Sequence, residues 1–98
     1  VQITEHRGGS TPEYIAITNT GSDPVDLTGW QLHSVRGDQW FAFPAGHVLA
    51  AGATVRVYSA TGSAPADGLL WTEKNMWNNE GDEARLIDAS GTVVSNAR

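Results

Sequence analysis

Hydrophobic and polar residues alternate along this chain in short runs, which glycine, proline, asparagine and aspartate separate from one another. In the run Glu13–Asn19, a spacing of two places Ile15 and Ile17 on one face. The same spacing places Val55 and Val57 together in a later run. No stretch keeps the i, i+3, i+4, i+7 spacing of an amphipathic helix. The pattern therefore predicts an all-β domain made of short strands.

The runs predict seven to nine short, mostly antiparallel strands, as in an immunoglobulin-like β-sandwich or a barrel. They are Val1–Glu5, Glu13–Asn19, Trp30–Val35, Gln39–Phe43, Val48–Leu49, Thr54–Ser59, Leu69–Trp71, Glu83–Asp88 and Thr92–Ser95. Val25–Leu27 is expected only as a bridging segment. In the first run we expect Val1, Ile3 and Glu5 to share a face. The domain is expected over residues 1–95, and residues 96–98 as a frayed tail.

Composition narrows the possible functions. Six Lys and Arg against eleven Asp and Glu give a net charge of −5, which argues against a nucleic-acid partner. The absence of cysteine excludes disulfides, thiolate metal sites and a cysteine nucleophile. No apolar run approaches the length that inserts into a membrane. Because the chain begins with Val1, we interpret it as part of a longer or processed protein.

The residues with catalytic potential form no recognisable motif. His6, His33 and His47 fall in separate segments with no carboxylate at ligand spacing, so we expect no metal site from them. No serine stands in a Gly-x-Ser-x-Gly elbow. We therefore expect no catalytic residue, no cofactor and no enzymatic activity.

Two further motifs have both a functional and a structural interpretation. The acidic stretch 78–83 supplies the hard oxygen ligands that calcium prefers, but it lacks EF-hand spacing. The alternative is a polar loop in which Gly81 and Asp82 lead into the next strand. Arg36-Gly37-Asp38 spells an integrin-recognition tripeptide, yet Gly-Asp is also what a hairpin tip requires. We favour the structural interpretation of both motifs.

Aromatic residues supply the candidate interaction surface. Alternation puts Phe41 and Phe43 on the inner face of their strand, which leaves Trp40 facing outward near Tyr58. Exposed aromatic rings anchor sugar rings or protein partners. We therefore take Trp40, Tyr58 and Met76 as this surface. The alternative is that a neighbouring loop covers Trp40.

An ordered set of short motifs extends over nearly the whole chain. It comprises Gly29-Trp30, Phe43-Pro44-Ala45-Gly46, Leu49-Ala50-Ala51-Gly52, Leu69-Leu70-Trp71, and Trp77-Asn78-Asn79 followed by Gly81-Asp82. This set resembles the lamin tail domain family, and the Trp-Asn-Asn-x-Gly-Asp motif resembles its prokaryotic members. The structural signature that the resemblance carries over is Gly29, Trp30, Phe43, Pro44, Gly52, Trp71, Trp77, Gly81 and Asp82.

The signature residues are expected to have structural roles. Trp30 is expected to fill the core between the sheets, after a turn that Gly29 permits because it lacks a Cβ. Gly52 is expected at a turn position with positive φ. Asp26 and Asp82 are expected to accept backbone N–H groups at strand entries.

The resemblance implies an immunoglobulin-like sandwich without catalytic residues. We expect a protein- or surface-interaction or spacer module within a larger, secreted or cell-surface bacterial protein. As an isolated domain it is expected to be a monomer, and its partner is not named by the sequence. The alternative is a carbohydrate- or calcium-binding accessory module of an extracellular hydrolase.

Overall fold

The computed structural model describes residues 1–7, 13–65, 68–72 and 82–97. Within these residues the chain forms ten strands and no helix. The strands are β1 (Gln2–Arg7), β2 (Glu13–Thr18), β3 (Val25–Asp26), β4 (Gln31–Ser34), β5 (Gln39–Ala42), β6 (Val48–Leu49), β7 (Thr54–Ser59), β8 (Leu69–Thr72), β9 (Ala84–Ile87) and β10 (Val93–Ala97).

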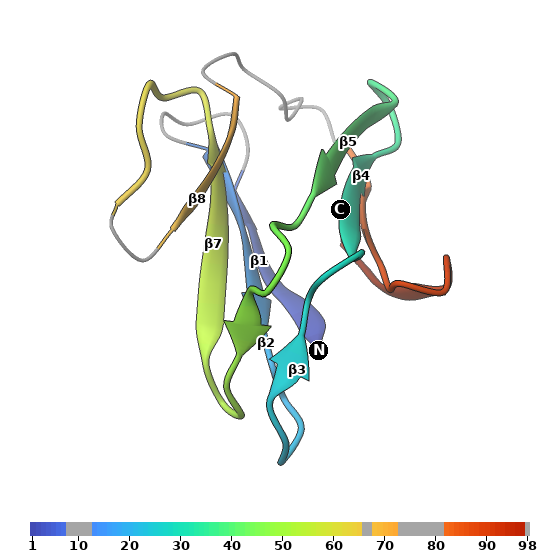
Figure 1. Ribbon diagram of the computed structural model, residues 1–98. Helices are drawn as coiled ribbons and strands as arrows, with labels where there is room; N and C mark the ends of the chain where they lie inside the picture. The colour runs from blue at the N-terminus through green and yellow to red at the C-terminus, as the bar shows by residue number, and fades with distance from the viewer. Residues whose placement is uncertain (8–12, 66–67, 73–81, 98) are drawn as a thin grey trace.

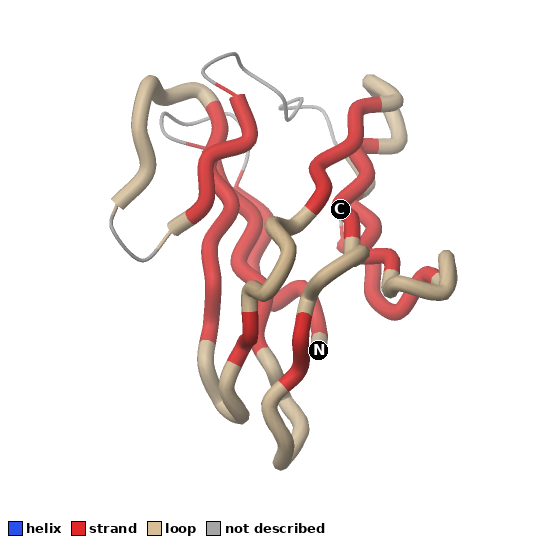
Figure 2. The backbone as a smooth tube through the Cα atoms, in the orientation of Figure 1, coloured by secondary structure: helices blue, strands red, loops and turns tan. Residues whose placement is uncertain are grey.

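Two four-stranded sheets face each other as an immunoglobulin-like sandwich (Figures 1 and 2). The first sheet has the order β1-β2-β7-β8 and the second sheet the order β10-β9-β4-β5. Every pairing is antiparallel except that of β7 with β8, which is parallel. The fold class expected from the alternation is confirmed.

The core lies between the two sheets because alternate side chains of each strand point inward. Its buried members come from both sheets and from the connections between them: Ile15, Ile17, Leu27, Leu32, Phe43, Leu49, Val55, Val57, Ala84 and Leu86. Burying one large aliphatic side chain of this kind contributes about 1.5–3 kcal/mol. The pairs predicted from the sequence, Ile15 with Ile17 and Val55 with Val57, are confirmed as inward-facing.

The two sides of the sandwich are closed differently. On one side β1 lies against β10, and the backbone N–H of Ile3 donates to Ser95 Oγ at 3.0 Å. On the other side the edge strands β5 and β8 diverge in the ribbon view (Figure 1). There the rings of Phe41 and Trp71, 5.6 Å apart, connect the two sheets. An aromatic contact thus links the two sheets on this side.

Three expectations about the strands are wrong in detail. Val25–Asp26 is a strand of its own because it pairs with β6, which raises the count to ten. A bulge between Ile3 and Glu5 shifts the register, so that Ile3 and His6 are partly buried and Glu5 is exposed. β10 continues to Ala97, which pairs with Ala84 of β9, so residues 96 and 97 extend the strand.

The signature residues around the turn before β4 also differ in part from expectation. Gly29 has φ +83°, and a Cβ there would lie 3.3 Å from the Cβ of Ala89, so its turn role is confirmed. Trp30 is only partly buried and packs against the edge of the core, whose centre is filled by Leu32 and its neighbours.

Phe43 and Pro44 follow β5 and end its pairing with β4. The N–H of Phe43, which is buried, donates to the carbonyl of Trp30 at 3.0 Å. Pro44 follows and has no N–H with which to continue the ladder. At the next turn, Gly52 has φ +76° and its N–H donates to the carbonyl of Asn19. Both assignments agree with the structural roles expected for these residues.

Candidate functional site

The β4–β5 hairpin presents the most exposed tryptophan of the described residues. A four-residue turn, residues 35–38, joins the strands and sets His33 opposite Trp40. Because Leu32 and Ser34 point into the core, the alternation of β4 forces His33 outward. Asp38 ends the turn at φ +52°, a conformation that aspartate tolerates better than most residues. The outer face of the second sheet therefore carries His33 and Trp40 side by side.

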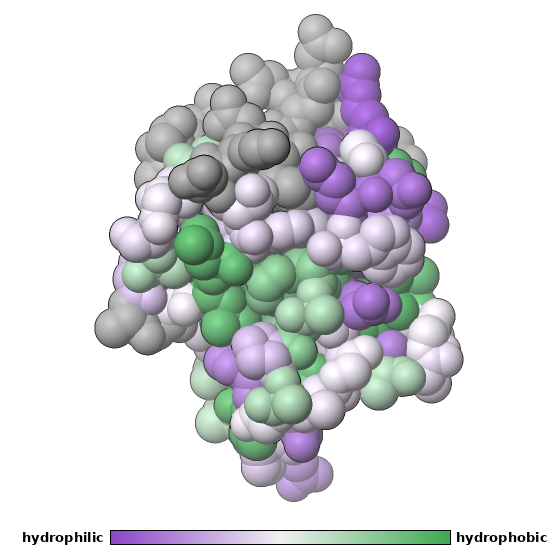
Figure 3. Space-filling view, turned by 45° about the horizontal axis from the view of Figure 1, so that its top comes forward, coloured by the Kyte–Doolittle hydropathy of each residue, from purple (hydrophilic) through white to green (hydrophobic). Residues whose placement is uncertain are grey.

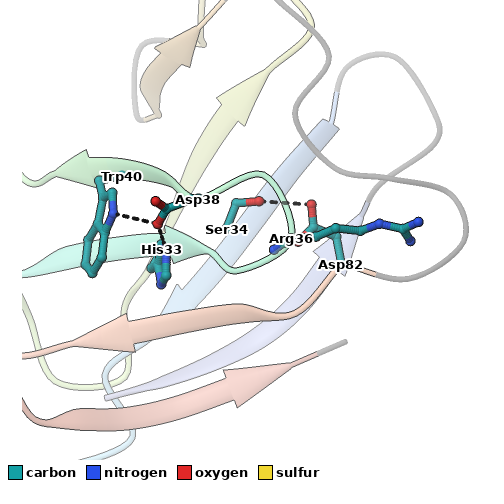
Figure 4. Close-up of polar contacts among 6 residues, drawn as sticks. All are labelled: His33, Ser34, Arg36, Asp38, Trp40 and Asp82. Atoms are coloured by element: carbon teal, nitrogen blue, oxygen red, sulfur yellow. Dashed lines mark hydrogen bonds and ion pairs between the residues drawn. The ribbon is translucent and has the colours of Figure 1, made fainter.

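Three side chains of the hairpin hold one another in a fixed arrangement, which we call the hairpin cluster: His33, Asp38 and Trp40. The imidazole and indole rings stack with centroids 3.9 Å apart and planes 13° from parallel. Asp38 Oδ1 accepts hydrogen bonds from His33 Nε2 at 2.9 Å and from Trp40 Nε1 at 3.3 Å (Figure 4). One carboxylate oxygen thus fixes the orientation of both rings.

Exposure differs sharply within the hairpin cluster. Trp40 is 48% exposed, whereas the His33 side chain is only 13% exposed. His33 lies in register between Trp40 and Arg85, and the ring of Trp40 stacks on it. Because His33 covers one face of the indole, the exposed area of Trp40 comes from the opposite face and the ring edges. The outward direction expected for Trp40 agrees with this exposure.

Asp38 supplies the carboxylate of the hairpin cluster. The hydrogen bond from His33 lowers the pKa of this carboxyl group, and the hydrogen bond from Trp40 lowers it further. The Asp38 side chain is 80% exposed and therefore remains a solvated carboxylate at neutral pH. The hairpin cluster therefore presents an aromatic face with a carboxylate at its edge, and the exposed Arg36 lies in the same turn.

Asp82, which precedes the neighbouring strand β9, anchors the hairpin. Asp82 Oδ2 accepts a hydrogen bond from Ser34 Oγ at 2.9 Å, and Asp82 Oδ1 accepts one from the N–H of Arg36 at 3.3 Å (Figure 4). The N–H of Val35 donates to the carbonyl of Glu83 at 3.0 Å. Asp82 is buried, and its two oxygens bind the hairpin. Its expected role as an acceptor of backbone N–H groups is confirmed.

Asp26 has the same kind of role at the other end of the sandwich. Its Oδ1 accepts the N–H of Thr28 at 2.9 Å and the Thr28 hydroxyl at 2.6 Å. These bonds from Thr28 lower the pKa of Asp26. Asp26 thus stabilises the turn that leads to Gly29.

The expected interaction surface is divided between the two sheets. Trp40 lies on the outer face of the second sheet, whereas Tyr58 lies on the outer face of the first. There Tyr58 contacts Tyr14, with ring centroids 5.6 Å apart. The expected proximity of Trp40 and Tyr58 is therefore wrong, because the strands that carry them join different sheets. Met76, Trp77 and Gly81 lie outside the described residues.

Hydrophobic side chains reach the surface beside the hairpin. Figure 3 shows a green area at the centre of the face and hydrophilic side chains at its upper right. The partly buried aromatic and aliphatic residues of the two edge strands are Phe41 on β5 and Leu69 and Trp71 on β8. Phe41 also contacts Phe43 edge to face, with centroids 5.2 Å apart. These residues pack against the core at the inner side of β5 and β8.

The side chains of His33, Ser34 and Asp38 are hydrogen-bonded within the protein. His33 and Asp38 form a pair, but the nearby hydroxyl of Ser34 is buried and donates to Asp82. In the described ranges no three or more His, Asp or Glu side chains are grouped so as to hold a metal ion. Of the stretch 78–83, only Asp82 and Glu83 are described, and Glu83 Oε2 accepts from Arg85 Nε at 2.9 Å.

Comparison with known proteins agrees with the fold. A sequence profile of the lamin tail domain matches residues 1–98. The chain belongs to the lamin tail domain family. This family is a non-catalytic module with an immunoglobulin-like fold that mediates protein interactions. The part of the chain described here also contains no helix long and apolar enough to cross a membrane.

One curated relative of this lamin tail domain is Lamin-C of Drosophila melanogaster. The two sequences are 33% identical over 66 residues. The match covers 62% of this chain and 11% of Lamin-C. The chain therefore corresponds to a small part of that relative, and the similarity concerns this domain alone.

Sequence reasoning did not find the hairpin cluster as a unit. Alternation predicts the outward Trp40, but in the sequence His33 is one of three separate histidines and Asp38 a turn residue. The signal that links them is register. In a hairpin with a four-residue turn after Ser34, His33 and Trp40 are directly opposite, and Asp38 lies two residues before Trp40.

Proposed function

We propose that this lamin tail domain is a non-catalytic interaction module within a larger, secreted bacterial protein, and that the β4–β5 hairpin contacts its protein partner. The family supports the non-catalytic part of this proposal. The Trp-Asn-Asn-x-Gly-Asp motif, residues 77–82, supports a prokaryotic source. The net charge of −5 disfavours nucleic acid as the partner.

The observation that carries the proposal is the exposed but ordered indole of Trp40. A tryptophan that is 48% exposed leaves apolar area in water unless a partner covers it. Its stack on His33 and its bond to Asp38 fix the ring before binding. Preordering lowers the entropy lost when an interface forms. Tryptophan is also enriched among the residues that dominate binding energy.

The hairpin cluster fits a cationic side chain of the partner. The open face of Trp40 offers a cation–π contact, and the Asp38 carboxylate at its edge offers an ion pair. A lysine or arginine of the partner satisfies both at once.

A site-specific photo-crosslinking experiment in the full-length parent protein tests this proposal. A photoreactive amino acid replaces Trp40 in one variant and Val48 in a matched control, since Val48 is also strongly exposed but lies on β6. We expect a discrete crosslinked product from position 40 and none from position 48. Equal products from both positions, or none from position 40, contradict the assignment of the hairpin.

Carbohydrate binding is the second candidate function, and the open indole face favours it. Sugar rings stack on exposed tryptophan, and a neighbouring carboxylate accepts bonds from hydroxyl groups. Titration of the domain with soluble cell-wall oligosaccharides, followed by tryptophan fluorescence, tests this candidate. A change that Trp40→Ala abolishes supports it. An unchanged spectrum in the presence of the sugars contradicts it.

The proposal also concerns the cellular location of the parent protein and the oligomeric state of the isolated domain. Fractionation of the producing cells is expected to find the parent protein outside the cytoplasm or at the cell surface. Light scattering across a concentration series is expected to give the mass of a monomer for the isolated domain. A mass that rises with concentration contradicts the monomer.

A further inference from the structure

The outer face of the first sheet carries a second organised surface, remote from the hairpin. Backbone register aligns one residue from each of its four strands in a row: Arg7, Tyr14, Tyr58 and Leu70. Arg56 lies one step further along β7, opposite Ala16. We call Arg7, Tyr14, Arg56, Tyr58 and Leu70 the arginine–tyrosine face.

Tyr14 holds both arginines at this surface. The guanidinium carbons of Arg7 and Arg56 lie 5.6 and 5.5 Å from the centroid of its ring. The hydroxyl of Tyr14 donates to Glu5 Oε2 at 2.7 Å, so the tyrosine is itself fixed. Tyr58 packs against the other side of this arrangement, 5.6 Å from Tyr14. The surface is therefore ordered before any partner arrives.

The two guanidinium groups keep their charge available. Ion pairs among the described residues, such as His33 with Asp38 and Arg85 with Glu83, do not include Arg7 or Arg56. A cation–π contact orients a guanidinium without neutralising it and leaves its N–H donors in the plane of the group. Both arginines are exposed. A carboxylate thus finds two oriented, charged donors on this face.

The charge of this surface differs in sign from the net charge of the chain. Glu5, Arg7 and Arg56 together give the face one positive charge, in a chain whose net charge is −5. Tyrosine and arginine are also the residue types enriched where interface energy concentrates. Leu70, which is 41% exposed, adds an apolar contact at one end of the row. At another border the hydroxyls of Thr4, Thr18 and Thr54 form a hydrogen-bonded chain with 2.8 Å steps.

We propose that the arginine–tyrosine face binds an extended acidic segment of a partner protein. Two carboxylates of the segment pair with Arg7 and Arg56, and its chain lies across Tyr14 and Tyr58. Alternate residues of an extended segment point to the same side about 7 Å apart. Because both guanidinium carbons lie within 5.6 Å of one ring centroid, acidic residues spaced by two reach both. The threonine hydroxyls form the polar border of the contact.

An NMR titration of the domain tests this proposal directly. The probe is an eight-residue peptide that alternates aspartate and serine, with both ends blocked, and the control peptide has asparagine in place of aspartate. We expect the acidic peptide to shift the backbone amides of β2 and β7, and the control peptide to leave them unchanged. Because the contact is ionic, the shifts are expected to diminish as salt is added.

Matched variants locate the binding. Arg7→Gln with Arg56→Gln is expected to weaken the association by about tenfold or more, because two charge-assisted contacts are lost. Arg85→Gln is the control, since Arg85 lies on the opposite sheet and already pairs with Glu83. It is expected to leave the association unchanged, as is Trp40→Ala. The latter variant separates this surface from the proposed function of the hairpin.

Several outcomes overturn the proposal. These are equal weakening by Arg85→Gln, equal binding of the asparagine peptide, or an absence of shifts on β2 and β7. Tighter binding of a single-stranded oligonucleotide of the same charge would instead assign the face to nucleic acid. The thermal melting of each variant is compared with the wild type. If the double variant does not fold, Arg56→Gln alone is used, and it is expected to weaken the association about threefold.

Discussion

The hydroxyl of Ser34 donates to the carboxylate of Asp82 at 2.9 Å in the interior of the sandwich, although 48 residues separate them in the sequence. Ser34 ends β4, and Asp82 precedes β9, the neighbouring strand of the same sheet. Both residues are buried, so neither can exchange this bond for water without opening the fold. The bond fixes the base of the hairpin that carries Trp40.

Removal of the Asp82 carboxylate is expected to destabilise the domain strongly. Asp82→Ala leaves the Ser34 hydroxyl and the Arg36 N–H without their acceptor, at a cost of about 3 kcal/mol. Chemical denaturation measures this cost. Combination with Ser34→Ala is expected to cost less than the sum of the two single variants, because they share one bond. Additive costs would show that the bond contributes nothing. Asp23→Ala, at an exposed loop position, is the control.

Three glycines form a graded series that separates backbone strain from steric overlap. Gly62→Ala meets open space at an ordinary φ and is expected to be neutral or slightly stabilising. Gly52→Ala meets open space but at φ +76°, with an expected cost of about 1 kcal/mol. Gly29→Ala adds a contact of 3.3 Å with Ala89 to φ +83°, so we expect about 2 kcal/mol.

Thermal melting of the three variants tests this order. Gly29→Ala is expected to melt lowest and Gly62→Ala at or above the wild type. If Gly52→Ala melts as high as Gly62→Ala, positive φ carries no strain at this turn. The series needs no knowledge of a partner, because all three positions lie outside the hairpin cluster and the arginine–tyrosine face.

Alternation along the chain was sufficient to predict the core of β2 and β7, because side-chain direction in a regular strand has a period of two. It failed in β1, where the bulge after Ile3 adds one residue and reverses the side on which Glu5 lies. A bulge leaves no clear mark in a single sequence. The error shows that local periodicity holds only while the register of both strands is unbroken.

The position of Trp40 relative to Tyr58 was beyond sequence reasoning for a different reason. Alternation correctly predicted that both side chains point away from the core. A sandwich has two outer faces, however, one on each sheet. The distinction depends on which strands pair, and those pairs are set by residues far apart in the chain, such as Ser34 and Asp82. The motif set identified the family, yet no motif contains His33 and Asp38, which position the indole.

Substitutions at Asp38 separate its carboxylate from its backbone conformation. Asp38→Gly and Asp38→Ala both remove the acceptor shared by His33 and Trp40. Only alanine is strained at φ +52°, so Asp38→Ala is expected to melt about 5 °C below Asp38→Gly. Both variants are expected to change the fluorescence of Trp40. Equal melting temperatures for the two variants would show that Asp38 contributes to stability through its carboxylate alone.

The pH dependence of stability is expected to include a contribution from His6. Burial lowers the pKa of His6 and outweighs the negative charges of Asp82 and Glu13, which raise it. Below pH 6.5, His6 is therefore protonated more readily in the unfolded chain than in the folded protein. This contribution to stability is complete above pH 6.5 and is lost as the pH falls toward the lowered pKa of the folded state.

Replacement of His6 by asparagine is expected to flatten this dependence, because asparagine does not titrate. Chemical denaturation of the wild type and of His6→Asn at pH 7.5 and pH 5 measures the difference. The wild type is expected to lose more free energy of unfolding between the two pH values than the variant does. The comparison rests on the change within each protein, so a constant cost of the substitution does not affect it. An equal loss in both proteins would show that Asp82 and Glu13 offset the burial of His6 completely.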